Sequence, residues 1–360
     1  MKATILHTEA SRGFGGQEVR ILAEARWLLD HGWGAWIAAQ PASRLLAEAT
    51  AADIPARAVG MSHATSLRGL LRLRRLMGQI SAAVIHTHSS VDSWLGALAA
   101  RSRSLPVVRS RHVSIPIPGR RALVYRLADR VITSGAVVKA MIEAAGVPPG
   151  RVVAIPAGID AGRFHGGVSG ASVRARLGAA GALVGLVANI RGSKGHQYFL
   201  EAVPRVLAER PDTHFLIVGD GVGFEDVQRR VEELGLGDRV VMTGFRRDVP
   251  EVMAALDVLV LPSVRSEAFP QVIPQALAVG TPVIGTTVGG IPEIIRDGET
   301  GRLVPPADAP ALAEAILELL RDPARARALA RRGQALVQES FTFEATMRAT
   351  IAVYEELLGR

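Results

Sequence analysis

Short apolar runs alternate along the chain with longer stretches whose apolar residues recur at every third or fourth position. Uninterrupted short runs are typical of parallel strands buried on both faces, and the longer period is typical of amphipathic helices. In the first half, the pattern predicts strands at Ala3–His7, Ala35–Ala38, Ala83–His86, Val107–Arg109 and Arg130–Thr133. In the second half, it predicts strands at Val184–Ala188, Phe215–Val218, Val240–Met242, Val258–Leu261 and Pro282–Gly285. This alternation predicts an α/β fold with parallel sheets.

A glycine-rich segment separates the two series of strands. Ile155–Gly170 contains five glycines and a proline, and this composition disfavours both helix and strand. A chain of 360 residues is also long enough for two α/β domains. We therefore predict two Rossmann-like domains, residues 1–165 and 166–342, with a final helix at about 343–360 that crosses back to the first domain.

The charge of the chain is unevenly distributed. Residues 1–165 hold 21 Lys and Arg against 10 Asp and Glu, a net charge of +11, whereas residues 166–360 hold 21 against 24, a net charge of −3. Within the first half, Leu67–Met77 predicts a helix with both apolar and arginine-rich faces, which suits either packing on a sheet or contact with anionic lipid. A basic domain attracts anionic partners such as a phospholipid surface or a phosphorylated glycolipid.

Other features of the composition narrow the classes of function. The chain has no cysteine, which excludes disulfides, thiolate nucleophiles and cysteine metal sites. No leader is recognisable at the start and no apolar run reaches the length of a membrane span, so we expect a cytoplasmic protein. With three tyrosines and no basic motif interleaved with aromatic residues, nucleic acid is not an expected partner.

Two loops are candidates for binding phosphate. Arg12–Glu18 follows the first strand, and its Gly15 and Gly16 precede a helix whose N-terminus attracts anions. Asn189–Gly195 follows the first strand of the second half and offers the cations Arg191 and Lys194. Each loop could equally be a plain turn or a solvated loop. Glycine-rich strand ends accompany the second loop, at Gly219, Gly221 and Gly244–Arg246.

A third candidate is the stretch Ser266–Ile284, in which Glu267 and Gln275 flank the start of a helix that ends at Gly280. Their spacing suits two polar groups that touch different parts of an extended ligand. Alternatively, Glu267 only stabilises the helix dipole, and Gln275 is an ordinary polar residue.

Histidines also gather at strand ends. His86 and His88 lie two residues apart, so they share a face of a strand, and with His7 they could form a metal site. No acidic cluster or Asp-x-Asp pair accompanies them. We therefore favour histidines that line a cleft or stabilise the fold, and we predict no metal site and no cofactor.

The order of these motifs resembles glycosyltransferase family 4, a retaining family with the GT-B fold of two Rossmann-like domains facing a cleft. The likeness runs from the Gly15–Gly16 loop to the final helix and is densest in the second half. The segments that carry it are Thr243–Val249, Asp257–Ser263, the Glu267 stretch, Gly289–Glu293, Asp297–Gly301 and Leu303-Val304.

The resemblance implies roles for individual residues in a donor site for a nucleotide-diphosphate sugar. Glu267 would hold hydroxyls of the sugar, and the backbone at Phe269 and Pro270 would touch phosphate. Arg191 and Lys194 would stabilise the leaving diphosphate without a metal, and Gly16 would meet it from the other domain. The strand ends at Gly219 and Gly221 and the backbone of Phe245 and Arg246 would also belong to the donor site. His112 would reach the transferred sugar.

The chain departs from the family pattern at Gln275, where the family usually has a glutamate that contacts ribose. An amide can still form a hydrogen bond there. We therefore predict a retaining transferase of cell-envelope polysaccharide synthesis. Its expected acceptor is an anionic glycolipid, a lipopolysaccharide or another polysaccharide intermediate, at the inner face of the membrane. The alternatives are a nucleotide-sugar epimerase and a non-catalytic nucleotide-sugar-binding subunit.

Overall fold

The computed structural model of the protein describes residues 2–115, 117, 119–265 and 267–359, so Ser266 of the predicted donor stretch lies outside it. The chain divides into an N-terminal unit, Met1–Pro156 with Thr346–Arg360, and a C-terminal unit, Ala157–Ala345. The division falls after Pro156, inside the predicted hinge, whereas the sequence analysis places it after residue 165. The final helix returns the chain to the N-terminal unit.

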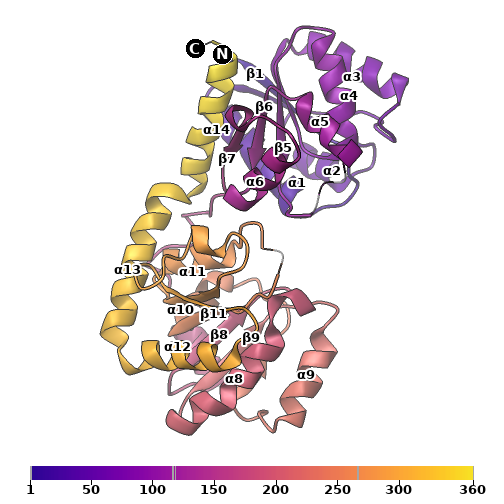
Figure 1. Ribbon diagram of the computed structural model, residues 1–360. Helices are drawn as coiled ribbons and strands as arrows, with labels where there is room; N and C mark the ends of the chain where they lie inside the picture. The colour runs from indigo at the N-terminus through magenta and orange to yellow at the C-terminus, as the bar shows by residue number, and fades with distance from the viewer. Residues whose placement is uncertain (1, 116, 118, 266, 360) are drawn as a thin grey trace. The chain divides into compact units, whose positions relative to one another are not determined.

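The N-terminal unit contains one parallel sheet whose described strands have the order β3-β2-β1-β4-β5-β6-β7. The strands are β1 (Thr4–Glu9), β2 (Gly34–Ala39), β3 (Ala56–Ala58), β4 (Ala82–Thr87), β5 (Val107–Arg111), β6 (Arg130–Thr133) and β7 (Val152–Ala154). The helices are α1 (Gly16–Asp30), α2 (Arg44–Ala51), α3 (Leu67–Gln79), α4 (Ser90–Arg101), α5 (Leu123–Arg126), α6 (Ala136–Ala144) and the final α14 (Phe343–Leu357) (Figure 1).

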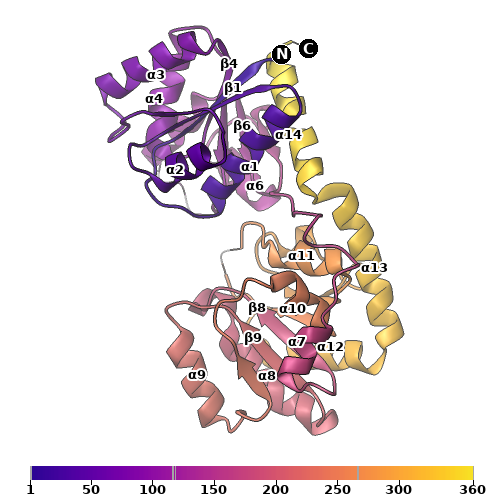
Figure 2. The ribbon, with the colours of Figure 1, turned by 180° about the vertical axis from the view of Figure 1, so that it is seen from behind.

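The C-terminal unit repeats this architecture with the described strand order β10-β9-β8-β11-β12-β13. Its strands are β8 (Leu183–Val187), β9 (His214–Val218), β10 (Val240–Met242), β11 (Val258–Leu261), β12 (Val283–Thr286) and β13 (Arg302–Val304). Its helices are α7 (Ala171–Leu177), α8 (His196–Glu209), α9 (Phe224–Glu233), α10 (Val249–Ala255), α11 (Val272–Val279), α12 (Ala309–Arg321) and α13 (Pro323–Ser340) (Figure 2). The prediction of two parallel-sheet α/β units is confirmed.

Three strands do not follow from the sequence pattern. β3, β7 and β13 have three residues each and lie at the edges of their sheets. An edge strand pairs with one neighbour and needs little apolar surface, so a strand this short leaves a weak periodic signal. The predicted strands all overlap observed strands, and they include one three-residue edge strand, β10, which its apolar run Val240–Met242 indicates.

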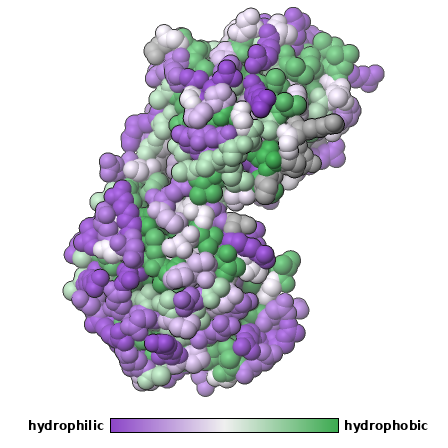
Figure 3. Space-filling view, viewed as in Figure 1, coloured by the Kyte–Doolittle hydropathy of each residue, from purple (hydrophilic) through white to green (hydrophobic). Residues whose placement is uncertain are grey.

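Alternate residues of the C-terminal sheet enter two different apolar clusters. Val258 and Val260 pack with residues of α8 and α12, whereas Leu259 and Leu261 pack with residues of α10 and α11. Since successive side chains of a strand point to opposite faces, the sheet is buried on both faces. In Figure 3, hydrophilic residues cover most of the visible surface of this unit. Among the described residues, no helix combines the length and apolar character needed to cross a bilayer.

The strand order locates the places where ligands can bind. In the C-terminal unit the chain winds in opposite directions from β8 and β11, and in the N-terminal unit from β1 and β4. Open α/β sheets bind ligands at such a switch point, beyond the carboxyl ends of the strands. The loops after β8 and β11 carry Arg191, Lys194 and Glu267, and the loop after β1 carries Gly15 and Gly16.

Glycine at the end of β9 permits a close approach of the backbone to the loop after β8. Gly219 has a φ of 142°, and a Cβ at this position would lie 1.8 Å from the carbonyl oxygen of Ala188. Gly221 has a φ of 149°, and its Cβ would lie 2.5 Å from the carbonyl oxygen of Ile190. Neither position can hold a side chain without moving the loop after β8.

We expect Gly219→Ala to lower the free energy of unfolding by about 3 kcal/mol, because it combines a strained φ with a collision against backbone. Urea denaturation followed by circular dichroism measures the change. The control is Gly237→Ala, at an open position without a positive φ, which should change stability by less than about 1 kcal/mol. Equal effects of the two variants would contradict the close approach.

Candidate functional site

The loops after β8 and β11 are joined by backbone contacts. Gly195 has a φ of 71°, and a Cβ on it would lie 1.9 Å from the carbonyl oxygen of Pro262. The amide of Val264 donates a hydrogen bond of 2.9 Å to the carbonyl of Ser193. These contacts hold the loop that carries Lys194 against the loop that leads to Glu267.

A buried ion pair also joins the loops after β8 and β11. Lys194 Nζ lies 2.5 Å from Glu267 Oε1, with 13% of the lysine side chain and 6% of the glutamate side chain exposed. The hydroxyl of Ser263 donates to the same carboxylate oxygen, and the amide of Gly290 donates to the Glu267 carbonyl at 3.0 Å. A buried carboxylate is costly unless it is paired and hydrogen-bonded. Here both conditions are met, and one carboxylate oxygen, Oε2, is left to bind a ligand.

A pocket of about 810 Å³ lies beyond the carboxyl ends of β8, β9 and β10. The predicted donor-site residues that line it are Gly219, Gly221, Phe245, Arg246 and Gln275. The Phe245 side chain is 73% exposed, and Arg246 Nε donates to Asp248 Oδ1 at 2.8 Å. The structure thus brings together residues from three loops and from α11, and their ligand remains a prediction.

The two predicted phosphate-binding cations have different surroundings. Lys194 pairs with Glu267, whereas Arg191 is exposed and lines an adjacent pocket of about 450 Å³ with His196. Burial, followed by the charge of Lys194, lowers the pKa of His196 to about 4, so its imidazole is neutral near pH 7. In the described structure, Arg191 is the more accessible cation of the loop.

Phe269 and Pro270 lie just before α11. The Phe269 ring packs against Phe341, with 5.3 Å between the ring centroids, so it stabilises the core of the unit. The N-cap residue of α11, Gln271, forms no side-chain capping bond and instead donates to the Ala157 carbonyl at 2.7 Å. The first turn of this helix offers few donors to an anion, because the Ile273 amide donates to the Pro270 carbonyl at 3.2 Å and Pro274 has no N–H.

The Gly15–Gly16 loop of the N-terminal unit lies among carboxylates. The Gly15 amide donates to Glu18 Oε2 at 2.8 Å, and the Ser11 amide donates to Glu9 Oε1 at 2.7 Å. Burial, with a smaller contribution from the charge of Asp92, raises the pKa of Glu9 to about 7. A Cβ on Gly16 would meet nothing within 4 Å, so a ligand can reach this position. An anion that binds the Gly15 amide must displace Glu18.

His112 follows β5 and lines a pocket of about 250 Å³ within the N-terminal unit. Burial, followed by the charge of Arg20, lowers the pKa of His112 to about 3. The ring is stacked on His88, with 5.9 Å between centroids, and its buried Nε2 has no hydrogen-bond partner. A neutral imidazole with a free ring nitrogen can orient a substrate hydroxyl.

The structure brings His7, His86 and His88 together, with ring nitrogens within 4.8 Å of one another. His7 Nδ1 lies 3.1 Å from His88 Nε2. Both nitrogens of His86 have partners, the Tyr354 hydroxyl at 2.6 Å and the Ser110 hydroxyl at 2.7 Å. Burial lowers the pKa of all three, that of His7 to about 4. The hydrogen bond between His86 and Tyr354 attaches α14 to β4.

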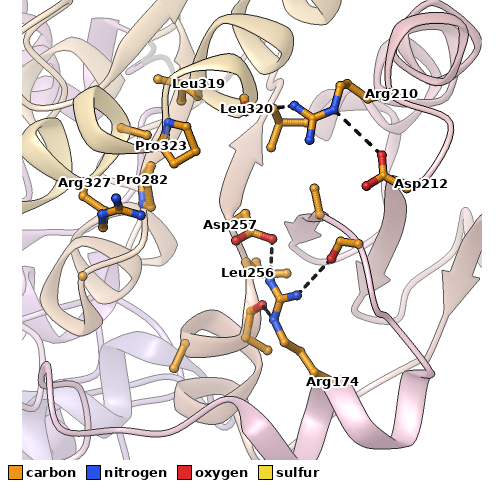
Figure 4. A pocket seen from close by; sticks show the side chains of 16 residues that line it. Arg174, Arg210, Asp212, Leu256, Asp257, Pro282, Leu319, Leu320, Pro323 and Arg327 are labelled. Carbon is orange, nitrogen blue, oxygen red and sulfur yellow. Dashed lines mark hydrogen bonds and ion pairs between the residues drawn. The ribbon is translucent and has the colours of Figure 1, made fainter.

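Another pocket of the C-terminal unit, of about 620 Å³, lies at the opposite, amino ends of the strands (Figure 4). Several of the side chains that line it already form hydrogen bonds or ion pairs with neighbouring residues. Arg174 donates to the carbonyls of Ala255 and Gly181 and pairs with Asp257, and Arg210 donates to the Leu320 carbonyl. We infer that these contacts stabilise the packing of the sheet against its flanking helices.

Comparison with known proteins identifies the family. Residues 14–163 match "Glycosyltransferase Family 4", and residues 181–322 match "Glycosyl transferases group 1". A D-inositol 3-phosphate glycosyltransferase from Streptomyces scabiei is 32% identical over 75% of this chain and 67% of its own length. The chain therefore belongs to the group 1, family 4 glycosyltransferases.

Two further similarities extend the comparison. A lipopolysaccharide core biosynthesis mannosyltransferase, LpsB, from Rhizobium meliloti is 32% identical over 56% of this chain and 60% of its own length. The structure of Anabaena Alr3699/HepE in complex with UDP has a TM-score of 0.88 and 22% identity, and covers 98% of this chain and 100% of that one. This likeness shows the GT-B fold. The chain spans about half the length of several relatives that it matches, 45% to 47% of three of them.

Sequence reasoning missed two features of these sites. It assigned Lys194 and Glu267 to separate ligand contacts, whereas the structure pairs them with each other. It treated Arg109 and Arg111 only as part of a basic region, although both line the pocket beside His112. Arg109 and Arg111 lie two residues apart at the end of one predicted strand, and this spacing was the signal in the sequence that they share a site.

We expect Lys194→Met to lower the free energy of unfolding by about 3 kcal/mol, because it leaves the Glu267 carboxylate buried without a cation. Adding Glu267→Gln should recover most of that loss, as chemical denaturation of the double variant will measure. Lys139→Met is the control, since the Lys139–Glu143 pair is longer, at 3.8 Å, and more exposed. A loss in Lys194→Met no larger than in this control would contradict a buried, coupled pair.

Proposed function

We propose that this chain is a retaining glycosyltransferase that moves a sugar from a nucleotide-diphosphate sugar to an acceptor hydroxyl without a metal. The observation that carries the proposal is the pocket at the carboxyl ends of β8, β9 and β10, in the unit whose loops after β8 and β11 are joined by the buried Lys194–Glu267 pair. The family membership and the UDP complex of a structural relative support a nucleotide sugar as donor.

The pocket offers a suitable surface for each part of the donor. Phe245 and Arg246 provide backbone and ring surface for the nucleobase, and Gln275 provides an amide for the ribose. Gly219 and Gly221 line the same pocket, where the nucleoside would lie. The backbone at Phe269 and Pro270, just before α11, would touch the diphosphate, as the family resemblance implies.

Catalysis, in this proposal, is electrostatic and positional. As the bond between sugar and diphosphate breaks, negative charge grows on the leaving oxygen. Lys194 turns from Glu267 to the phosphate, and Arg191 adds a second cation from the same loop. Glu267, released from Lys194, accepts hydrogen bonds from hydroxyls of the sugar. The acceptor hydroxyl attacks the resulting oxocarbenium-like carbon, its proton passes to the departing diphosphate, and the sugar keeps its anomeric configuration.

Residues of the N-terminal unit take roles that the family resemblance suggests. His112, neutral at pH 7 because of its lowered pKa, orients the reacting centre through its free Nε2. Gly16, whose surroundings are open, presents the N-terminus of α1 to the diphosphate. The N-terminal unit is thus the acceptor-binding domain, and the C-terminal unit is the donor-binding domain.

The acceptor in this proposal is an anionic glycolipid, a lipopolysaccharide or another polysaccharide intermediate, reached at the inner face of the cytoplasmic membrane. The charge of +11 in residues 1–165 supports an anionic partner. α3 supports a peripheral membrane contact, since Leu67 and Leu71 are exposed beside Arg68, Arg72 and Arg75. The name of the LpsB relative points in the same direction.

The relatives favour transfer over the two alternatives. Their names describe glycosyl transfer, whereas a purely binding subunit is supported here by the presence of Gln275 alone and an epimerase only by the shared architecture. Gln275 lines the pocket and keeps a hydrogen-bonding group there, which is compatible with transfer.

We expect a nucleoside diphosphate at about a hundred times its dissociation constant to stabilise the protein by about 2.7 kcal/mol in the presence of a chelator. Arg191→Ala/Lys194→Ala should abolish most of this gain, because both cations face the diphosphate in the proposal. Thermal unfolding with uracil, guanine and adenine nucleotides measures it. Arg327→Ala/Arg331→Ala, which removes two exposed arginines of α13, should retain the gain. Stabilisation by no nucleotide would contradict the proposed donor site.

A further inference from the structure

The pocket beside His112 is formed by the loops after β4 and β5 and by α5. Arg109 and Arg111 line it from β5, together with His88, Ser89, Ser90, Gln17 and Tyr125. All of these residues belong to the N-terminal unit, so the pocket exists independently of the donor site. At about 250 Å³, it suits one small polar group rather than a whole sugar nucleotide.

Tyr125 positions both arginines. The guanidinium of Arg109 lies over the Tyr125 ring, 3.9 Å from its centroid. Arg111 Nη1 donates to the Tyr125 hydroxyl at 2.7 Å, and its Nη2 donates to the Ile115 carbonyl. Packing on one aromatic side chain fixes the two planar groups before any ligand arrives, which is the arrangement that favours bidentate recognition of an oxyanion.

The arginines carry more donors than the protein satisfies. Arg109 is 4% exposed, yet its Nε and Nη1 are buried without a hydrogen-bond partner among the residues that the structure describes. Within the same described residues, Arg111 Nε and His112 Nε2 are buried without a partner as well. Among the described residues, neither guanidinium takes part in an ion pair. Buried donors without partners are rare in folded proteins, and a buried cation without a counter-charge is costly.

Asp92, the carboxylate that acts on the pKa of Arg109, does not pair with the unpaired donors of the arginines. Asp92 accepts hydrogen bonds from the amides of His88 and Ser89, at 2.8 Å and 2.9 Å, and from the Thr8 hydroxyl at 3.0 Å. Its role is therefore to hold the start of α4. Burial lowers the pKa of Arg109 from its ordinary value, with Tyr125 and Asp92 acting in the opposite direction. The pocket therefore offers donors that suit an anion, and the Asp92 carboxylate is bonded to other groups.

We propose that this pocket binds a phosphoryl group of the acceptor, with Arg109 and Arg111 as its hydrogen-bond donors and His112 beside it. Two guanidinium groups offer more donors than the two oxygens of one carboxylate need, and they match the three free oxygens of a phosphate ester better. The assignment to the acceptor, though not the phosphoryl site itself, rests on the proposed function, because the donor's own phosphates are assigned to the C-terminal unit. The phosphoryl group would hold the acceptor hydroxyl near His112.

The test is isothermal titration calorimetry of inorganic phosphate into the full chain carrying Arg191→Ala/Lys194→Ala, which removes the proposed donor-phosphate cations. Adding Arg109→Met or Arg111→Gln should weaken phosphate binding at least about tenfold, since each removes charged hydrogen-bond donors. Adding Arg57→Gln, an exposed arginine of the same unit, should leave the affinity within about twofold. Sulfate should displace phosphate, and acetate should not.

A second readout separates an anion site from a structural role. Arg109→Met keeps an apolar side chain over Tyr125 and removes an unpaired buried charge, so its melting temperature without phosphate should equal or exceed that of the parent. A lower melting temperature with unchanged phosphate binding would overturn the proposal. If Arg109→Met does not fold, Arg111→Gln decides, because Arg111 is only partly buried.

Other outcomes would also overturn the proposal. One is that the parent does not bind phosphate, and another is that Arg111→Gln and Arg57→Gln bind phosphate with equal affinity. A third is that acetate displaces phosphate as effectively as sulfate does, because this result would assign the pocket to a carboxylate. Nucleotide stabilisation, measured for Arg109→Met and Arg111→Gln with Arg191 and Lys194 intact, tests the donor site separately. Phosphate binding without nucleotide binding would contradict the proposed transfer and leave the phosphoryl site standing.

Discussion

The ion pair between Lys194 and Glu267 joins the two loops on which the C-terminal site depends. It is buried, and it lies where the chain winds in opposite directions from β8 and β11. A buried pair of this kind contributes little net stability compared with apolar residues, but it is costly to break on one side only. In this account, the pair matters because each of its residues can also bind a part of the ligand. A phosphate can replace Glu267 as the partner of Lys194, and sugar hydroxyls can replace Lys194 as partners of Glu267.

The backbone of the loops around the pair is held by close contacts. In this account, these contacts make the exchange of partners by Lys194 and Glu267 specific. Gly195 and Gly219 bring main chain against main chain where no side chain fits. Preorganised groups of this kind stabilise developing charge without being rearranged during the reaction. In the N-terminal unit, Tyr125 holds Arg109 and Arg111 in place, while three of their donor atoms have no partner among the described residues.

Much of the fold could be predicted from the sequence, because strands buried on both faces appear as apolar runs and glycine marks the segment between the units. The short edge strands β3, β7 and β13 could not, since an edge strand needs few apolar side chains, whereas the equally short β10 could. Among the site residues, Gly219, Gly221 and Gln275 were expected in one site and line one pocket. Their ligand is still a prediction. The pairing of Lys194 with Glu267 joins positions 73 residues apart, and no local pattern encodes such a contact. Unpaired donors on Arg109 likewise become visible only when the surroundings of the side chain are known.

The most direct test of the central claim is a crystal structure of the protein with a bound nucleoside diphosphate. The account predicts that the nucleoside occupies the pocket lined by Gly219, Gly221 and Gln275. It also predicts that Lys194 Nζ lies within hydrogen-bond distance of a diphosphate oxygen and has left Glu267. A nucleotide bound elsewhere, with the Lys194–Glu267 pair intact, would contradict it.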